Sequence, residues 1–300
     1  MAVARMLVGL RLDTPLLAAA AAVLHRAPSM RVAHSVGWHL GQAAGARTRV
    51  ARLRSGSRMA VDVRDHAHRH AFLFGLHEED ATRLVARISR PGWTVLDVGA
   101  NAGYFSLLAC DLGGLGSRAV AFEPNPRMVD LLHRSAALNP RAPLEIVAAA
   151  CGEHDGQAGL YLSPDPHNTG LSRLLESTAG TGDVPVAVVR LDAFCAGREL
   201  RPDLIKIYVE GGETGVLFGA EQLLREGHPS HVICELWAAS RDELVDFMAG
   251  LGYVMHDIRP DGSLGPASAM QGQWQMVCFR HDRADRAQAS VDRAPRCRTC

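Results

Sequence analysis

The chain has 300 residues, of which 47% are hydrophobic and 21% are charged, and its formal net charge at pH 7 is zero. This apolar content is sufficient for a complete hydrophobic core, which excludes a wholly disordered chain. The zero net charge argues against a general nucleic-acid-binding protein. The length fits one large α/β domain with additions or two small domains.

The amino-terminal segment differs from the rest in charge, because residues 1–60 contain nine Arg and a single acidic residue, Asp13. We expect residues 1–59 to form an Arg-rich helical extension, with the strongest helical pattern at residues 19–24. A surface for an acidic partner or a membrane is the alternative interpretation of this charge. The apolar stretch at residues 16–24 is too short to span a membrane, so no transmembrane segment is predicted.

The seven cysteines are scattered and odd in number, and several of them, such as Cys234 and Cys278, lie within apolar runs. Cysteine in such a run behaves as a small hydrophobic residue. This usage favours a reducing compartment over a disulfide framework, and we expect a cytoplasmic protein.

Strand and helix patterns follow in chain order. Residues 60–63 and 71–74 have strand-like patterns, and residues 78–88 have the spacing of an amphipathic helix. Further strands are predicted at residues 95–98, 119–122, 144–150, 203–209, 231–236, 253–258 and 273–279, and further helices at 104–110, 126–138, 214–226 and 241–251. This alternation predicts an α/β fold with a mostly parallel, seven-stranded sheet, right-handed crossovers and helices on both faces.

Two segments depart from the alternation. Residues 156–183 are rich in Pro and Gly, and we expect a loop or hairpin insertion over the strand ends, where ligands bind in open α/β sheets. Residues 282–300 are polar without an apolar period, and a disordered tail is predicted there. The main domain is therefore expected over residues 60–281.

The most specific local pattern is the strand, turn and helix of residues 95–110. Gly99 and Gly103 allow the backbone of the turn to approach a ligand, and the helix that follows directs its first N–H groups to the same place. Asp97, at the end of the strand, can accept a hydrogen bond from an ammonium or hydroxyl group. Asn101 stands where a dinucleotide-binding fingerprint has its second glycine, so a cofactor without a pyrophosphate fits better than the nicotinamide cofactor of a dehydrogenase.

Glu123 follows the next predicted strand. An acidic residue at this place can hold two ribose hydroxyls by charge-assisted hydrogen bonds. The glycine loop and the acid at this spacing together indicate a nucleoside-containing cofactor more strongly than either one alone. A tight turn followed by a surface glutamate is the alternative interpretation.

Three motifs resemble those of the FkbM-type methyltransferases. Residues 95–106 resemble the first motif of that family, residues 122–126 the second, and residues 205–213 the third. Weaker matches are residues 75–78, 168–172 and 191–192, and the order agrees over roughly residues 60–280. The resemblance implies the Rossmann-like fold of class I methyltransferases, S-adenosylmethionine as cofactor, and O-methylation of a hydroxyl on a small molecule such as a sugar or a secondary metabolite.

The resemblance also implies which residues contact the cofactor. These are Glu78, Asp97, Gly99, Asn101, Gly103, Glu123, Asn125, Cys151 and Glu153. The first motif would surround the methionine part, Glu123 would hold the ribose with Asn125 nearby, and the turn at Cys151 would approach the adenine. Asn168 and Glu210 would lie near the reacting end.

The third motif departs from the family pattern Lys-x-Asp-x-Glu-Gly, because Tyr208 stands in the place of Asp. On a strand, Lys206, Tyr208 and Glu210 would share one face, and Glu210 would be the obvious partner of Lys206. A catalytic base contributes about 10²–10⁴-fold to a proton transfer. If the missing Asp has this role in the family, the alternative to an active O-methyltransferase is a weak or inactive, methyltransferase-like binding protein.

Histidines supply further candidates. His167 is a candidate base, with a solvated loop histidine as the alternative. His66, His68 and His70 alternate, so an extended chain would place three imidazoles on one side, as a metal site or as an exposed strand edge. The resemblance implies no metal, and none is expected.

The expected partner is a hydroxylated small-molecule acceptor and not a nucleic acid. The sequence leaves open whether the protein forms a homo-oligomer. Trp237 is a candidate for the substrate side of the sheet or for core packing.

Overall fold

The computed structural model of the chain describes residues 48–165, 168, 172–174, 184–270 and 272–282. Residues 1–47 of the expected extension, the candidate base His167 and nearly all of the expected tail lie outside the described residues. No helix in the described ranges is long and apolar enough to cross a membrane.

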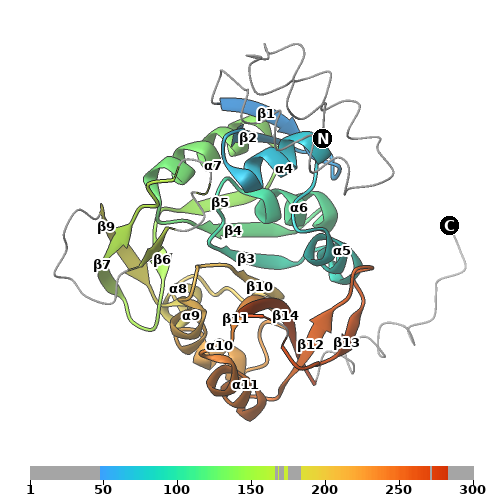
Figure 1. Cartoon of the computed structure of the whole chain (residues 1–300), viewed down its shortest axis with the longest axis vertical. Helices are drawn as coiled ribbons and strands as arrows, with labels where there is room; N and C mark the ends of the chain where they lie inside the picture. Colours follow the sequence, from blue (N-terminus) through green and yellow to red (C-terminus); the bar gives the residue numbers. More distant parts are fainter. Residues whose placement is uncertain (1–47, 166–167, 169–171, 175–183, 271, 283–300) are drawn as a thin grey trace, which may run out of the picture.

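The central sheet has eight strands in the order β13-β12-β14-β11-β10-β3-β4-β5 (Figure 1). Five of them are mutually parallel: β3 (Thr94–Val98), β4 (Arg118–Phe122), β5 (Leu144–Val147), β10 (Leu204–Ile207) and β11 (His231–Trp237). Three antiparallel strands complete the sheet: β12 (Tyr253–Ile258), β13 (Leu264–Pro266) and β14 (Trp274–His281). The predicted mostly parallel sheet is confirmed, but the predicted number of seven strands was wrong, because the three-residue β13 pairs with β12 at the edge.

Helices pack on both faces of this sheet, and successive residues of its central strands supply two separate cores. Val95 and Leu204 contribute to the core with α5 (Glu79–Ile88), α6 (Tyr104–Gly113) and α7 (Pro126–Leu138). Leu96 and Ile205 contribute to the opposite core with α8 (Leu191–Ala196), α9 (Glu213–Phe218), α10 (Glu221–Arg225) and α11 (Arg241–Gly250). Burial on both faces explains why these strands are continuously apolar in sequence.

The single helix expected at residues 214–226 is instead the pair α9 and α10. Gly219 lies between them, and a Cβ at this position would come 2.1 Å from the carbonyl oxygen of Gly152. The turn between the helices therefore packs directly against the backbone that follows β6.

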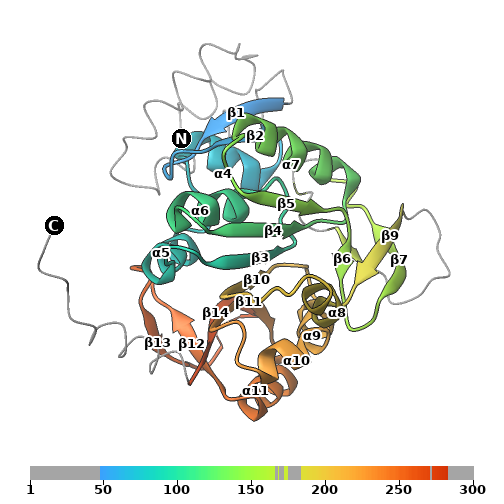
Figure 2. The same cartoon turned by 180° about the vertical axis from the view of Figure 1, so that it is seen from behind.

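A second, four-stranded sheet lies beside the main one (Figures 1 and 2). It consists of β6 (Ala150–Cys151), β7 (Gly156–Tyr161), β8 (Arg173–Leu174) and β9 (Val184–Val189), in the order β6-β9-β7-β8. The antiparallel pair β7–β9 agrees with the expected hairpin insertion. The strand predicted over residues 144–150 was wrong as a single element, since the chain leaves the main sheet after Val147 and enters the second sheet at Ala150.

The segment before the main sheet forms a hairpin and a helix. β1 (Thr48–Arg52) pairs with β2 (Arg58–Asp62), so strands occur where helix and loop were expected, and the expected boundary at residue 59 falls within β2. Residues 71–74 lie in α4 (His66–Phe74) and not in a strand. Four consecutive buried apolar residues have no period that distinguishes a strand from a helix. The helix begins after Asp65, whose side chain caps it by accepting from two backbone N–H groups.

Ser135 of α7 joins this hairpin to the loop after β3. Its side chain is fully buried, and its Oγ accepts from the Ala60 N–H and donates to the Ala102 carbonyl, both at 3.0 Å. Removal of the hydroxyl would leave two buried backbone groups without partners.

We therefore expect Ser135→Ala to lower the free energy of unfolding by about 1–3 kcal/mol in urea denaturation. The control is Ser263→Ala, which removes a hydroxyl that donates to Asp261 in an exposed turn, with an expected change below about 0.5 kcal/mol. Equal, small effects of the two variants would contradict the bridging role of Ser135.

Candidate active site

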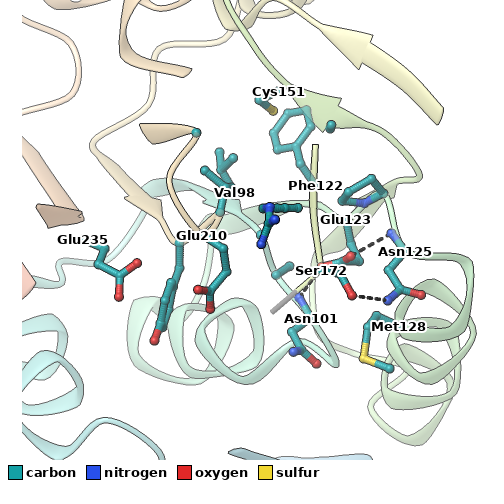
Figure 3. A pocket seen from close by; sticks show the side chains of 18 of the residues that line it. Val98, Asn101, Phe122, Glu123, Asn125, Met128, Cys151, Ser172, Glu210 and Glu235 are labelled. Atoms are coloured by element: carbon teal, nitrogen blue, oxygen red, sulfur yellow. Dashed lines mark hydrogen bonds between the residues drawn. The ribbon is translucent and has the colours of Figure 1, made fainter. Parts of the chain in front are cut away.

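A cavity of about 1180 Å³ lies at the carboxyl ends of the parallel strands. Its wall comes from the loops after β3, β4, β6 and β10, from the end of β11 and from α4 (Figure 3). This is the position at which open α/β sheets bind their ligands. The volume exceeds the roughly 300–1,000 Å³ of a typical small-molecule pocket, so two ligands can be accommodated.

The loop after β3 can adopt its path only with glycine at position 99. Gly99 has a φ of +75°, and a Cβ there would come 1.9 Å from the carbonyl oxygen of Tyr208. The Tyr208 N–H in turn donates to the Val98 carbonyl at 2.9 Å, and the Gly99 N–H donates to Phe122 at 3.0 Å. The ends of β10, β3 and β4 are thus held together by their backbones, which brings the side chains that follow each strand into one cavity.

Glu123, directly after β4, receives two backbone hydrogen bonds. Its Oε2 accepts from the Asn101 N–H and its Oε1 from the Asn125 N–H, both at 2.8 Å (Figure 3). Burial raises the pKa of Glu123 to about 7, although these two N–H donors oppose the shift. Each carboxylate oxygen has further lone pairs, so a ligand with neighbouring hydroxyls can bind at this residue.

Lys206 lines the cavity and forms a buried ion pair with Asp97, which lies outside the lining. Asp97 on β3 lies directly opposite Lys206 on β10, and the Lys206 Nζ is 3.8 Å from the Asp97 Oδ1. Ser106 donates to the other oxygen of Asp97 at 2.6 Å. The Lys206 Nζ also lies over two aromatic rings, 5.1 Å from the ring centroid of Phe105 and 4.9 Å from that of Tyr208. The prediction that Glu210 is the partner of Lys206 was therefore wrong, because strand register decides the pairing.

Carboxyl groups and aromatic rings gather at one end of the cavity. Glu210 and Glu235 lie together there, across the cavity from Asn125 (Figure 3). Burial, followed by the charges of neighbouring carboxylates, raises the pKa of Glu235 to about 8 and that of Glu210 to about 7. The same causes raise the pKa of the Tyr208 phenol. The indole N–H of Trp237 donates to Glu235 at 3.0 Å, so Trp237 belongs to this end of the cavity.

Glu235 and His77, which the sequence did not single out, also line the cavity, as does His68, which was considered only as a metal ligand or part of a strand edge. Glu235 is the only acidic residue of the apolar strand β11, and a single carboxylate at the end of such a strand was a readable signal. Burial, followed by the charge of Lys206, lowers the pKa of His77 to about 3, so its imidazole is neutral.

The predicted site residues separate into two groups. Those that line the cavity are Gly99, Asn101, Glu123, Asn125, Cys151, Glu153, Asn168, Lys206, Tyr208 and Glu210. Asp97, Gly103 and Glu78 lie outside the lining. Gly103 packs against α7, where a Cβ would come 2.5 Å from a methyl group of Leu132, and the carboxylate of Glu78 is 3.6 Å from His77.

The alternating histidines lie on helix α4, so the expectation of an extended chain with three imidazoles on one side was wrong. His66 and His68 line the cavity, whereas His70 contacts the Leu76 carbonyl through its Nδ1 at 2.8 Å. No group of three or more metal-ligating side chains occurs in the part of the chain that the structure describes.

The parallel sheet, the glycine loop and the buried acid after the next strand are the features of a Rossmann-like fold that binds a nucleoside-containing cofactor. Residues 97–255 match the family model of the methyltransferase FkbM domain, and the chain belongs to this family. It is an S-adenosylmethionine-dependent methyltransferase.

Three solved structures illustrate the structural similarity. The chain has 12% identity and a TM-score of 0.44 to an S-adenosylmethionine-dependent methyltransferase from Agrobacterium tumefaciens, with 79% of this chain and 71% of that chain covered. A precorrin-6y methyltransferase from Geobacter metallireducens has 14% identity and a TM-score of 0.40, with 69% and 89% covered. TYW2 from M. jannaschii, in complex with AdoMet, has 12% identity and a TM-score of 0.41, with 79% and 86% covered. A search of curated proteins found no match.

The residues of the cavity fit S-adenosylmethionine. The cofactor contains a diol, an amino-acid end and a positive charge. Glu123 presents a carboxylate for the diol, and the Asn101 Nδ2 has no hydrogen-bond partner among the described residues, so it can donate to the amino-acid end. Glu210 and Glu235 line the same cavity, but their raised pKa values leave both carboxyl groups partly protonated near neutral pH.

We expect Gly99→Ala to weaken S-adenosylmethionine binding at least 100-fold, which is about 2.7 kcal/mol. The reason is that the added methyl group would meet the Tyr208 carbonyl and separate the two strand-end loops. The measurement is calorimetric titration of the folded variant.

Gly92→Ala is the matched control, because Gly92 also has a positive φ (+84°) but no atom lies within 4 Å of the position that a Cβ would take. This variant should bind the cofactor as the wild type does. A Gly99→Ala variant with unchanged affinity would contradict the close contact between the loops.

Proposed function

We propose that this methyltransferase transfers the methyl group to a hydroxyl of a small molecule, such as a sugar or a secondary metabolite. The observation that most supports this proposal is Glu235, a 2% exposed carboxyl group with a pKa of about 8 in the same cavity as the cofactor-binding loops. A general base is most effective when its pKa lies near the working pH. A hydroxyl group needs such a base, because its proton must leave as the new bond to carbon forms.

The roles of the other residues follow from their positions. S-adenosylmethionine, when bound, supplies an electrophilic methyl group on its sulfonium. Glu123 holds the ribose hydroxyls, Asn101 donates to the methionine part, and the turn at Cys151 contacts the adenine. Glu235 receives the proton of the acceptor hydroxyl, and the Trp237 indole N–H keeps this carboxylate in place. In-line positioning of donor and acceptor provides most of the remaining rate enhancement.

Tyr208 does not serve as the base in this proposal. Its raised pKa keeps the phenol protonated at neutral pH, and its ring lies against the ammonium of Lys206. Lys206 has its counter-charge in Asp97, so the loss of the family's Asp at position 208 leaves no unpaired buried cation. This arrangement favours an active enzyme over the weak or inactive binding protein that the substitution suggested.

A small-molecule acceptor is favoured over a nucleic acid by charge. The chain has no net positive charge, and the acceptor end of the cavity contains Glu210 and Glu235. Phosphate groups are held chiefly by Lys and Arg. Glu210 and Glu235 repel phosphate once the pH exceeds their raised pKa values. The excess volume of the cavity over that of a single-ligand pocket supplies room for the acceptor.

Two further proposals concern the surroundings of the protein. We propose a cytoplasmic location, supported by five free and buried cysteines among the described residues. A homo-oligomer stays a proposal to be tested by the molar mass in solution.

Glu235→Gln should lower the methyl-transfer rate about 10²–10⁴-fold, because the amide cannot accept the proton. The wild-type rate should rise with pH through about 8, since the ionised carboxylate is the active form, and the variant should lose this rise. Transfer is measured as S-adenosylhomocysteine released with a panel of monosaccharides and simple phenols.

The affinity of the Glu235→Gln variant for S-adenosylmethionine should stay unchanged. A variant with the wild-type rate and pH profile would exclude Glu235 as the base, and tight cofactor binding without transfer to any panel member would favour the binding-protein alternative.

Tyr208→Phe should keep the transfer rate within about threefold of the wild type, because the ring over Lys206 is retained and only the protonated phenol is removed. Tyr208→Ala removes the ring as well and should lower the rate further. These rates are compared at saturating cofactor. A 100-fold loss in Tyr208→Phe would assign the phenol hydroxyl a direct role.

A further inference from the structure

His68 lies on helix α4, which comes before residues 97–255 of the FkbM domain in the sequence. Its side chain is buried against the loop after β3. It is 1% exposed, lies in the first turn of α4, and lines the cavity. The Asp65 carboxylate caps this turn by accepting from the backbone N–H groups of Ala67 and His68. The side chain of His68 is therefore presented to the loop after β3 by a fixed backbone.

The hydrogen-bond partners of His68 determine where its proton lies. The Asp62 backbone N–H can only donate, and it points at the His68 Nδ1 at 3.2 Å, so Nδ1 is an acceptor without hydrogen. The Ala102 backbone N–H donates to the Asn101 Oδ1 at 2.7 Å, so this atom of the amide is its oxygen. The His68 Nε2 lies 2.6 Å from the same oxygen and must donate to it. His68 is thus neutral and protonated at Nε2.

This network fixes the orientation of the Asn101 amide. Two donors converge on its Oδ1, and the opposite end, Nδ2, has no hydrogen-bond partner within the described part of the chain. The backbone of Asn101 is equally constrained, with a φ of +53° and its N–H bound to Glu123. Asn101 lines the cavity, with its backbone N–H on Glu123 (Figure 3), and its Nδ2 can donate two hydrogen bonds.

We propose that His68 is a positioning residue for S-adenosylmethionine: it holds the Asn101 amide so that Nδ2 donates to the carboxylate of the methionine part. The proposal rests on the placement of the methionine part at Asn101. Within that part, only the carboxylate can accept a hydrogen bond, because the ammonium is a donor. Without the His68 donor only the Ala102 N–H holds the amide oxygen, and an amide that turns would present its oxygen to the ligand carboxylate and repel it.

Two variants of His68 separate its two hydrogen bonds. His68→Asn keeps a short acceptor toward the Asp62 N–H but cannot reach Asn101. His68→Gln extends an amide N–H to about the place of Nε2. Each variant is titrated calorimetrically with S-adenosylmethionine and with 5′-methylthioadenosine, which lacks the amino-acid part.

We expect His68→Asn to weaken S-adenosylmethionine binding about tenfold and to leave 5′-methylthioadenosine binding within about twofold of the wild type. His68→Gln should stay near the wild type with both ligands. Asn101→Asp, which leaves His68 unchanged, should also weaken only S-adenosylmethionine, because a carboxylate would then face a carboxylate. This last variant tests the amide orientation even if a His68 variant fails to fold.

Three results would overturn the proposal. Equal weakening of both ligands in His68→Asn would show a structural role only, and unchanged affinity for both would show that Asn101 needs no support. Additive losses in His68→Asn and Asn101→Ala would show that the residues act separately. A folded wild type that binds S-adenosylmethionine no more tightly than 5′-methylthioadenosine would instead contradict the placement of the methionine part. A folded wild type that binds neither ligand would contradict the cofactor site itself.

Discussion

The buried ion pair between Asp97 and Lys206 is the interaction on which the site depends. The two residues lie opposite each other on β3 and β10, and neither is more than 4% exposed. Removal of one member of such a pair leaves an uncompensated buried charge and typically costs about 3–5 kcal/mol. The pair thus favours the register in which the loops after β3 and β10 meet, and Gly99 permits their contact.

The contact between the loops after β3 and β10 brings the functional side chains into one cavity. The β3 loop contributes Asn101, β4 contributes Glu123, and the two acids Glu210 and Glu235 follow or end β10 and β11. Asn101 and Glu123, which we propose bind the cofactor, accept hydrogen bonds from backbone N–H groups. Among the residues that the structure describes, the acids at the other end have no such donor apart from the Trp237 indole, and their raised pKa values suit them for proton transfer.

The sequence motifs predicted those site residues that lie close together in the chain. Gly99, Asn101 and Glu123 lie within one strand-turn-helix unit and the strand that follows it, so their place in one cavity could be inferred without a structure. The partner of Lys206 could not, because it depends on the register of strands more than 100 residues apart in sequence, as the pairing of Leu204 with Val95 shows. Likewise residues 71–74 of α4 were mistaken for a strand, since four consecutive apolar residues have no period, and His68 was interpreted as part of a metal site or an exposed strand edge.

The position of bound S-adenosylhomocysteine in a crystal structure tests this account most directly. We expect the adenine beside Cys151, both ribose hydroxyls on Glu123, the product carboxylate on the Asn101 Nδ2, and the sulfur facing the end of the cavity that contains Glu235. A product bound in the reverse direction, or outside the loops after β3 and β4, would contradict it.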